Sequence, residues 1–169
     1  MARSNMQEIW DGYNEQEELL EIDLIRGEEI PEGVFHLAAS VIIKHVDGSY
    51  LLMQRDFSKS FPGFFEATAS GAVLKGETPS IAAIREAKEE TGVVIGIPIL
   101  LNKMIIRRHQ LILYFYLAET ECAKTSVKLQ QGETIAYKWV DRQGFLDFMA
   151  SDEVYPEQRV AIDNYLKSI

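Results

Sequence analysis

Segments rich in Ile, Leu, Val and Tyr alternate along the chain with short polar stretches. This composition is typical of β-strands, because branched and aromatic side chains pack well on a pleated sheet. The pattern predicts a sheet-rich fold. The expected strands are residues 6–10, 18–26, 34–46, 49–55, 64–73, 97–106, 110–119 and 134–140.

Turn signals and the last part of the chain complete this outline. Asp47-Gly48 lies between two strong strand candidates and predicts a hairpin. Residues 6–30 are expected to form another hairpin at the N-terminus, and residues 141–169 are expected to be helical. Pro156 suits the first turn of the final helix. The pattern therefore predicts an α+β or α/β/α layered domain with a mixed sheet.

Residues 71–93 read GAVLKGETPSIAAIREAKEETGV and contain a clear helix signal. Thr78 is a suitable N-cap residue, and Pro79 suits the first helical position. We expect the helix to end near Thr91, with Gly92 as a left-handed C-terminal residue.

The two sides of this helix differ in chemistry. At roughly 100° per residue, three carboxylates fall within an arc of about 100°: Glu86, Glu89 and Glu90. The opposite side carries Ile81, Ile84 and Ala87, and we expect that side to pack on the sheet. Because carboxylates that close repel one another, a cation is expected between them. Mg²⁺ is the default choice for oxygen ligands, with Mn²⁺ as an alternative.

Charge and composition narrow the class of partner. The chain has 169 residues, enough for one domain with a sizeable core, and its formal net charge is −9. An acidic protein is poorly suited to nonspecific binding of nucleic acid or anionic membranes. An anionic substrate would need local help, such as a metal ion. Cys122 is the single cysteine, so no intramolecular disulfide can form, and no apolar leader or membrane span is visible. We expect a cytoplasmic location.

The segment 71–93 resembles the Nudix box, the signature of the Nudix hydrolases. Written as a pattern it is G-x5-E-x7-R-E-A-x-E-E-x-G-V. Ala87 departs from the family, which usually has Ile, Leu or Val there. The resemblance implies a single Nudix domain over residues 1–169, with a mixed sheet sandwiched between helices. The positions that match the box are Gly71, Glu77, Arg85, Glu86, Glu89, Glu90 and Gly92.

The resemblance also implies a reaction. Nudix hydrolases cleave nucleoside diphosphates linked to another moiety, and related organic pyrophosphates, with a divalent metal. Carried over to this chain, Glu86 and Glu90 are the main metal ligands, with Glu89 close behind and the carbonyl of Gly71 as a further ligand. Arg85 is expected to orient a box carboxylate. Two box positions are expected to be structural: Glu77, which would hold the loop to the helix, and Gly92.

The general base and the substrate contacts are less defined. In this family the base is a box glutamate or one on a later loop, and Glu133 is the candidate here; a surface turn glutamate is the alternative. Arg55 and Lys59 are candidates for binding a phosphate or ribose, or else solvated bases. An aromatic cluster is a candidate apolar wall for a base or prenyl chain. It consists of Phe57, Phe61, Phe64 and Phe65.

Before the box, the chain has the N-terminal hairpin and the strand that starts near His36 (residues 10–43), the strand GSYLLMQR (48–55) and the segment SKSFPGFFEATASG (58–71). These segments resemble the isopentenyl-diphosphate isomerase branch of the superfamily. That branch has a catalytic Cys and a metal-binding His just before the box, where this chain has Ser70 and Ala72. Serine has too high a pKa for the proton transfer, and alanine cannot bind a metal. We therefore expect an isomerase-like Nudix hydrolase.

Two alternatives to a hydrolase stay open: an isomerase, and a non-catalytic nucleotide-sensing domain. ADP-ribose-like compounds, nucleotide sugars, nucleoside triphosphates and isoprenoid diphosphates are all candidate small-molecule substrates. A homodimer through the C-terminal helices is expected only by analogy with the family.

Overall fold

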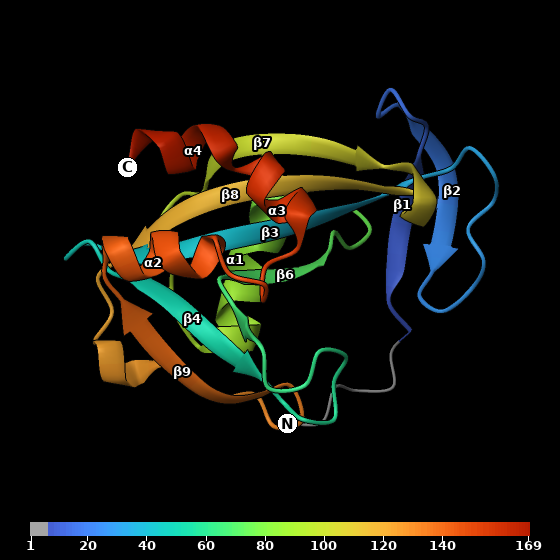
Figure 1. Cartoon of the computed structure of the whole chain (residues 1–169). Helices are drawn as coiled ribbons and strands as arrows, with labels where there is room; N and C mark the ends of the chain where they lie inside the picture. Colours follow the sequence, from blue (N-terminus) through green and yellow to red (C-terminus); the bar gives the residue numbers. More distant parts are fainter. Residues whose placement is uncertain (1–6) are drawn as a thin grey trace.

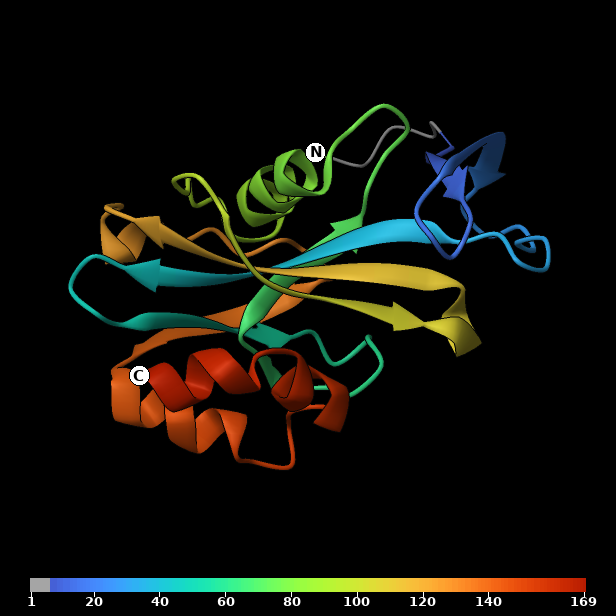
Figure 2. The same cartoon turned by 90° about the horizontal axis from the view of Figure 1, so that it is seen from above.

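A mixed β-sheet forms the middle layer of the protein, with helices on both faces. The computed structural model describes residues 7–169. Helix α1 (Pro79–Thr91) covers one face. The other face is covered by α2 (Arg142–Met149), α3 (Pro156–Ala161) and α4 (Asp163–Ser168) (Figures 1 and 2). This arrangement confirms the layered α+β fold expected from the sequence.

The main sheet has seven strands within the described residues. At its centre β3 pairs in parallel with β8 along its whole length, and antiparallel β7 lies at the edge beyond β8. On its other edge, β3 pairs with β6 and, next to the turn that joins β3 to β4, with β4. Strand β4 in turn pairs with β5 and β9. The bounds are β3 (His36–His45), β4 (Tyr50–Arg55), β5 (Phe65–Glu66), β6 (Thr68–Ala72), β7 (Ile99–Ile106), β8 (Leu111–Thr120) and β9 (Thr134–Val140).

The N-terminal hairpin, β1 (Ile9–Tyr13) and β2 (Leu19–Ile25), stands at one end of the main sheet (Figure 2). Residue 6, the first of the predicted strand 6–10, lies outside the described residues. The hairpin is fastened to the main sheet by backbone hydrogen bonds in both directions between Tyr13 and Phe35 (2.9 and 2.7 Å). It is also fastened to the loop before α1, where Gly76 N donates to a carboxylate oxygen of Asp11 (2.8 Å).

Alternating side chains of the central strands build two cores. On β3, Val41 and Ile43 face α1, whereas Ile42 faces the C-terminal helices. On the latter side Tyr50 of β4 stacks on Phe145 of α2, with ring centroids 4.0 Å apart. Both rings are fully buried, so removing either would leave a large cavity. The sheet is therefore fixed between its two helical layers.

Helix α1 begins and ends as the sequence predicts, but of the three residues predicted to pack on the sheet only Ala87 does so. Thr78 Oγ1 accepts a hydrogen bond from Ile81 N, and Gly92 closes the helix with φ 71°. Ile81 and Ile84 are 52% and 40% exposed, whereas the side facing the sheet consists of Ala82, Ala83, Glu86 and Ala87. Small alanines allow the helix to lie close to the sheet. As a result the glutamate face, rather than the isoleucine face, is directed inward.

Two predicted elements are broken in the structure. The strand expected over 64–73 is interrupted at Ala67, where the chain leaves β4 and begins to pair with β3. The final helix is split at Ile162, whose φ is −113°. The preceding carbonyl, that of Ala161, accepts a hydrogen bond from the side chain of Asn102 (2.8 Å). No helix within residues 7–169 is long and apolar enough to cross a membrane.

Candidate active site

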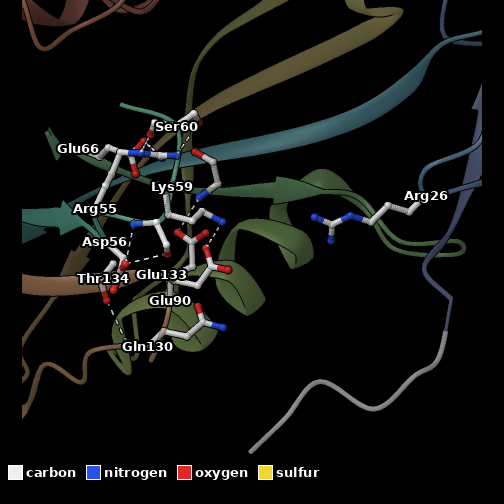
Figure 3. A network of polar contacts seen from close by, with 12 residues as sticks. Arg26, Arg55, Asp56, Lys59, Ser60, Glu66, Glu90, Gln130, Glu133 and Thr134 are labelled. Carbon is white, nitrogen blue, oxygen red and sulfur yellow. Dashed lines mark hydrogen bonds and ion pairs between the residues drawn. The ribbon is translucent and has the colours of Figure 1, made fainter. Parts of the chain in front are cut away.

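A cavity of about 360 Å³ opens between β6, the end of α1, the loop after β4 and the N-terminal hairpin. Glu86 and Glu90 of α1 line it together with Gly71 of β6. Glu66 and Glu133 approach from the opposite wall, and Figure 3 shows Glu133 close to Glu90. The cavity thus gathers carboxylates from segments that are far apart in the sequence.

Gly71 allows β6 and α1 to approach each other closely. A Cβ atom at this position would lie 2.0 Å from Oε1 of Glu86 and 2.2 Å from its Cδ. No side chain larger than hydrogen fits beside that carboxylate unless the Glu86 side chain moves. The backbone of Gly71 and the carboxylate of Glu86, which is only 5% exposed, are therefore direct neighbours.

Arg85 ties the loop before α1 to the helix and to β6. Its Nε and Nη2 donate to the two carboxylate oxygens of Glu77 (2.8 and 2.9 Å). Nη2 also donates to the carbonyl of Ala72 (2.9 Å), and Nη1 donates to Glu86 (2.5 Å). The guanidinium fork suits this bidentate contact. One cation therefore holds two box carboxylates in place.

The pKa values of Glu77 and Glu90 shift in opposite directions. Burial opposes ionisation of Glu77, but hydrogen bonds from Arg85 and from Leu74 N lower its pKa below the ordinary value. Burial, followed by the charge of Glu86, raises the pKa of Glu90 to about 8. One backbone donor, Ser70 N, contacts a Glu90 oxygen at 3.1 Å. Among residues 7–169, Glu90 therefore lacks a cationic partner of the kind that Glu77 has.

Glu89 lies differently from the other two helix carboxylates. Its side chain is 42% exposed and one oxygen is 3.7 Å from Arg85 Nη1, whereas Glu86 and Glu90 line the cavity. Within residues 7–169, no three His, Cys, Asp or Glu side chains form a ready-made metal-binding group. The shared space expected for three carboxylates is thus lined by two of them.

The structure brings together Glu133 and Lys59, two residues singled out from the sequence for different roles. Lys59 Nζ lies 2.6 Å from Oε2 of Glu133, and both line the cavity. The two loops are also joined by a backbone bond from Asp56 N to Glu133 O (2.8 Å) (Figure 3). Glu133 therefore lies on the cavity wall opposite α1.

Arg55 also lines the cavity, but most of its donors have partners within its own loop. Its Nη1 donates to Glu66 (2.5 Å), and its Nε donates to the carbonyl of Ser60 (2.7 Å). Nη2 contacts the hydroxyl of Ser60 (3.1 Å). Glu66, which the sequence analysis did not single out, contributes a further carboxylate to this wall.

The aromatic side chains around the cavity differ from those expected. The cluster of Phe57, Phe61, Phe64 and Phe65 does not line it. Phe57 is 73% exposed. Trp10 of β1 and His36 of β3 line the cavity instead, together with Arg26 just after β2. The sequence gives no signal that Trp10 and Arg26 belong to the site, because only the folding of the hairpin brings them to the cavity.

Ser70 and Ala72 lie on β6 at the cavity wall. The Ser70 hydroxyl is 2.7 Å from that of Ser40 and donates to Thr68 Oγ1 (3.2 Å). Its backbone N–H contacts Glu90, and the carbonyl of Ala72 contacts Arg85. The positions that would carry an isomerase Cys and His thus serve here as backbone partners of the box residues.

The NUDIX domain family model matches residues 34–164. The chain therefore belongs to the Nudix family, in agreement with the box and with the layered fold. The N-terminal hairpin precedes the matched residues.

Curated relatives are also Nudix proteins. The chain is 41% identical over 91 residues to the uncharacterized Nudix hydrolase lin0387 of Listeria innocua, a match that covers 53% of this chain and 54% of that protein. It is 40% identical over 63 residues to the uncharacterized Nudix hydrolase orf19 of Rhodococcus erythropolis, over 36% of this chain and 34% of that one. The chain spans about half the length, or less, of these two relatives.

Solved structures share the fold at low sequence identity. DR0079 of Deinococcus radiodurans superposes with a TM-score of 0.64 at 20% identity, over 87% of this chain and 91% of that one. An Ap4A hydrolase of C. elegans gives a TM-score of 0.56 at 22% identity, over 78% and 96% of the two chains. These likenesses concern the fold alone.

Proposed function

We propose that this protein hydrolyses a phosphoanhydride bond in a nucleoside diphosphate derivative or a related organic pyrophosphate, with a divalent cation held by Glu86 and Glu90. One observation carries the proposal: a buried carboxylate, Glu86, and a half-buried one, Glu90, face a cavity, and Glu90 has no cationic partner among the described residues. Membership of the Nudix family supports the reaction class.

The residues fit a hard cation such as Mg²⁺. Carboxylate and carbonyl oxygens are the donors that it prefers. A positive charge beside Glu90 would remove the cause of its raised pKa, because it would offset both the burial and the charge of Glu86. The backbone of Gly71 lies against Glu86, which makes its carbonyl a third candidate ligand. Mn²⁺ offers similar coordination chemistry. Glu89 would join by turning away from Arg85.

A bound divalent cation neutralises diphosphate charge and acidifies a water molecule that can attack phosphorus. The chain's own residues prepare this chemistry. Arg85 fixes the position of Glu86 and, through Glu77, that of the loop before the helix. Glu133, which lines the cavity close to Glu90, would accept a proton from water. Lys59, which now pairs with Glu133, would contact a substrate phosphate.

Arg55 has a smaller role in this proposal than the sequence suggested. Because its donors hold Glu66 and Ser60, it shapes the loop that carries Lys59 and contacts phosphate only as a secondary partner. The isomerase alternative is disfavoured, because Ser70 and Ala72 offer neither a thiol nor an imidazole at the cavity wall.

The test is a cleavage screen of the purified protein with Mg²⁺ or Mn²⁺. The panel would contain ADP-ribose, nucleotide sugars, dinucleotides, nucleoside triphosphates and isopentenyl diphosphate, with products identified by mass. We expect metal-dependent release of phosphate or a nucleoside monophosphate from at least one compound, and none from Glu90→Gln. Double-bond migration in isopentenyl diphosphate without phosphate release would favour the isomerase. Nucleotide binding without any cleavage would favour the sensor.

A further inference from the structure

The cavity extends from the carboxylates of α1 to the N-terminal hairpin, and the two ends differ in chemistry. At the hairpin end the rings of Trp10 and His36 are stacked, with centroids 4.5 Å apart and planes 18° apart. Arg26 and Glu8 line the same end. The NUDIX family model matches residues 34–164, so Trp10, Arg26 and Glu8 lie outside the matched residues, whereas His36 lies inside them.

Arg26 is directed into the cavity with most of its donors available. Its Nη1 donates to Oε1 of Glu8 (2.8 Å), and this is its one side-chain partner among the described residues. Figure 3 shows the guanidinium extending from the end of β2 toward the carboxylates of Glu90 and Glu133. The Arg26 side chain is 56% exposed. Its planar face and remaining N–H groups can therefore meet a ligand.

The stacked pair is flat and has incomplete hydrogen bonding. Burial lowers the pKa of His36, so its ring is neutral at pH 7. Trp10 Nε1 and His36 Nδ1 are closed off from solvent without a hydrogen-bond partner in the part of the chain that the structure describes. Buried polar atoms usually have partners, and exceptions are common where a ligand or water completes the network.

We propose that the hairpin end of the cavity is a subsite for the base of a nucleotide substrate, with Trp10 as the stacking surface and Arg26 and Glu8 at the base edge. Every base has a π-face that stacks on an aromatic ring. The edge of a base carries both acceptors and donors, which match a guanidinium and a carboxylate. The inference rests on the proposed function, since the diphosphate would occupy the carboxylate end of the same cavity.

A prenyl chain is a poorer occupant of this subsite. It would remove water from the Arg26–Glu8 ion pair and give no hydrogen bond in return, which is costly for charged groups. The volume of about 360 Å³ lies in the range of small-ligand pockets. The substrate class inferred is thus nucleoside diphosphate derivatives rather than isoprenoid diphosphates.

The experiment uses ligands that cannot be hydrolysed at an anhydride. AMP, GMP, CMP and UMP are titrated with Mg²⁺ into Trp139→Phe protein, and ribose 5-phosphate and isopentenyl monophosphate serve as controls without a base. The chain has two tryptophans, so Trp10 is then the sole tryptophan fluorophore. Trp139 lies on β9, where its Nε1 donates to the carbonyl of Lys124 (3.0 Å).

We expect at least one nucleoside monophosphate to quench Trp10 and to bind about tenfold tighter than ribose 5-phosphate, as stacking plus edge contacts provide. In otherwise wild-type protein, calorimetry should show that Trp10→Leu and Arg26→Met each lose most of this preference. Arg26→Met is the safer variant for folding, because the side chain is largely exposed. Equal binding of all ligands, a preference that survives both variants, or preferential binding of isopentenyl monophosphate would each overturn the subsite.

The binding assay tests the base subsite and the cleavage screen tests the proposed hydrolysis, so either proposal can be contradicted without the other. Base-dependent binding without cleavage of any diphosphate would sustain the subsite and contradict the proposed function. Cleavage of diphosphates with no dependence on Trp10 or Arg26 would support the proposed function and contradict the base subsite.

Discussion

Glu77 and Glu90 belong to the same short segment, and both are partly withdrawn from water. They differ in the partners that surround their carboxylates and in the direction in which their pKa values shift. Glu77 receives two hydrogen bonds from Arg85 and one from Leu74 N, so its pKa is lowered. Glu90 receives one from Ser70 N, and burial, followed by the charge of Glu86, raises its pKa to about 8. Among the described residues, Arg85 supplies the cation that balances Glu77, whereas Glu90 has no such partner.

This difference distinguishes box residues that hold the fold together from box residues that can bind a ligand. A carboxylate paired with an arginine fixes the loop and helix whether or not a ligand is bound. A buried carboxylate without such a partner costs stability and is retained where it serves a site. We therefore propose a structural role for Glu77 and a cation-binding role for Glu90.

The largest effect is expected from Glu90→Gln. The substitution keeps the shape of the side chain but removes its charge, so metal-dependent cleavage should fall by about 100-fold or more, since even outer-shell partners of a metal cost 10- to 100-fold. The melting temperature without metal should stay level or rise. Steady-state kinetics on the substrate found in the screen would measure the loss. Glu119→Gln, whose carboxylate lies 3.8 Å from Lys44 outside the cavity, is the matched control. Cleavage undiminished in Glu90→Gln would remove Glu90 from the site.

For Glu77→Gln we expect a clear loss of stability and a smaller loss of activity than for Glu90→Gln. Losing the ionised partner of Arg85 weakens charged hydrogen bonds, which are worth about 1.5–3 kcal/mol, so unfolding in urea should occur at a clearly lower midpoint. Cleavage should fall about tenfold, because Glu86 loses part of its support. A variant as stable as the wild type would show that Glu77 is not the structural member of the pair.

A pH dependence of stability is also expected in the absence of metal. Because the folded protein keeps the proton of Glu90 up to about pH 8 while the unfolded chain loses it near the ordinary pKa of 4.5, the folded state binds more protons in between. Stability should therefore fall as pH rises through this range. The lowered pKa of Glu77 acts in the opposite sense, since its contribution is lost as pH falls below its ordinary value.

The measurement is chemical denaturation of wild type and Glu90→Gln in EDTA between about pH 5.5 and 8. The difference between the two proteins isolates Glu90 from other titrating groups. Stability curves that stay parallel across this range would contradict a raised pKa for Glu90.

The box and its helix could be predicted because their signals are local. Thr78, Pro79 and Gly92 act on their own backbone, so helix α1 has the expected bounds. The orientation of the helix was not predictable in this way. Ile81 and Ile84 suggested an apolar contact, but the closeness allowed by Gly71 and the alanines determines which side faces the sheet.

The remaining parts of the site depend on contacts between distant segments. The pairing of Lys59 with Glu133 joins loops more than 70 positions apart in the sequence. Trp10 and Arg26 enter the cavity only because the hairpin folds back against β3 and the loop before α1. No motif marks them, since a tryptophan and an arginine at these positions would suit an ordinary surface hairpin.

Cation binding by Glu90 is tested most directly by calorimetric titration of Mg²⁺ into wild type and Glu90→Gln near pH 7, in two buffers that differ in ionisation enthalpy. The difference between buffers gives the number of protons released on binding. If Glu90 is protonated in the metal-free protein and binds the cation, the wild type should release close to one proton per ion. Glu90→Gln should release none and bind more weakly. Equal affinity and equal proton release in the two proteins would contradict the assignment of Glu90 as a metal ligand.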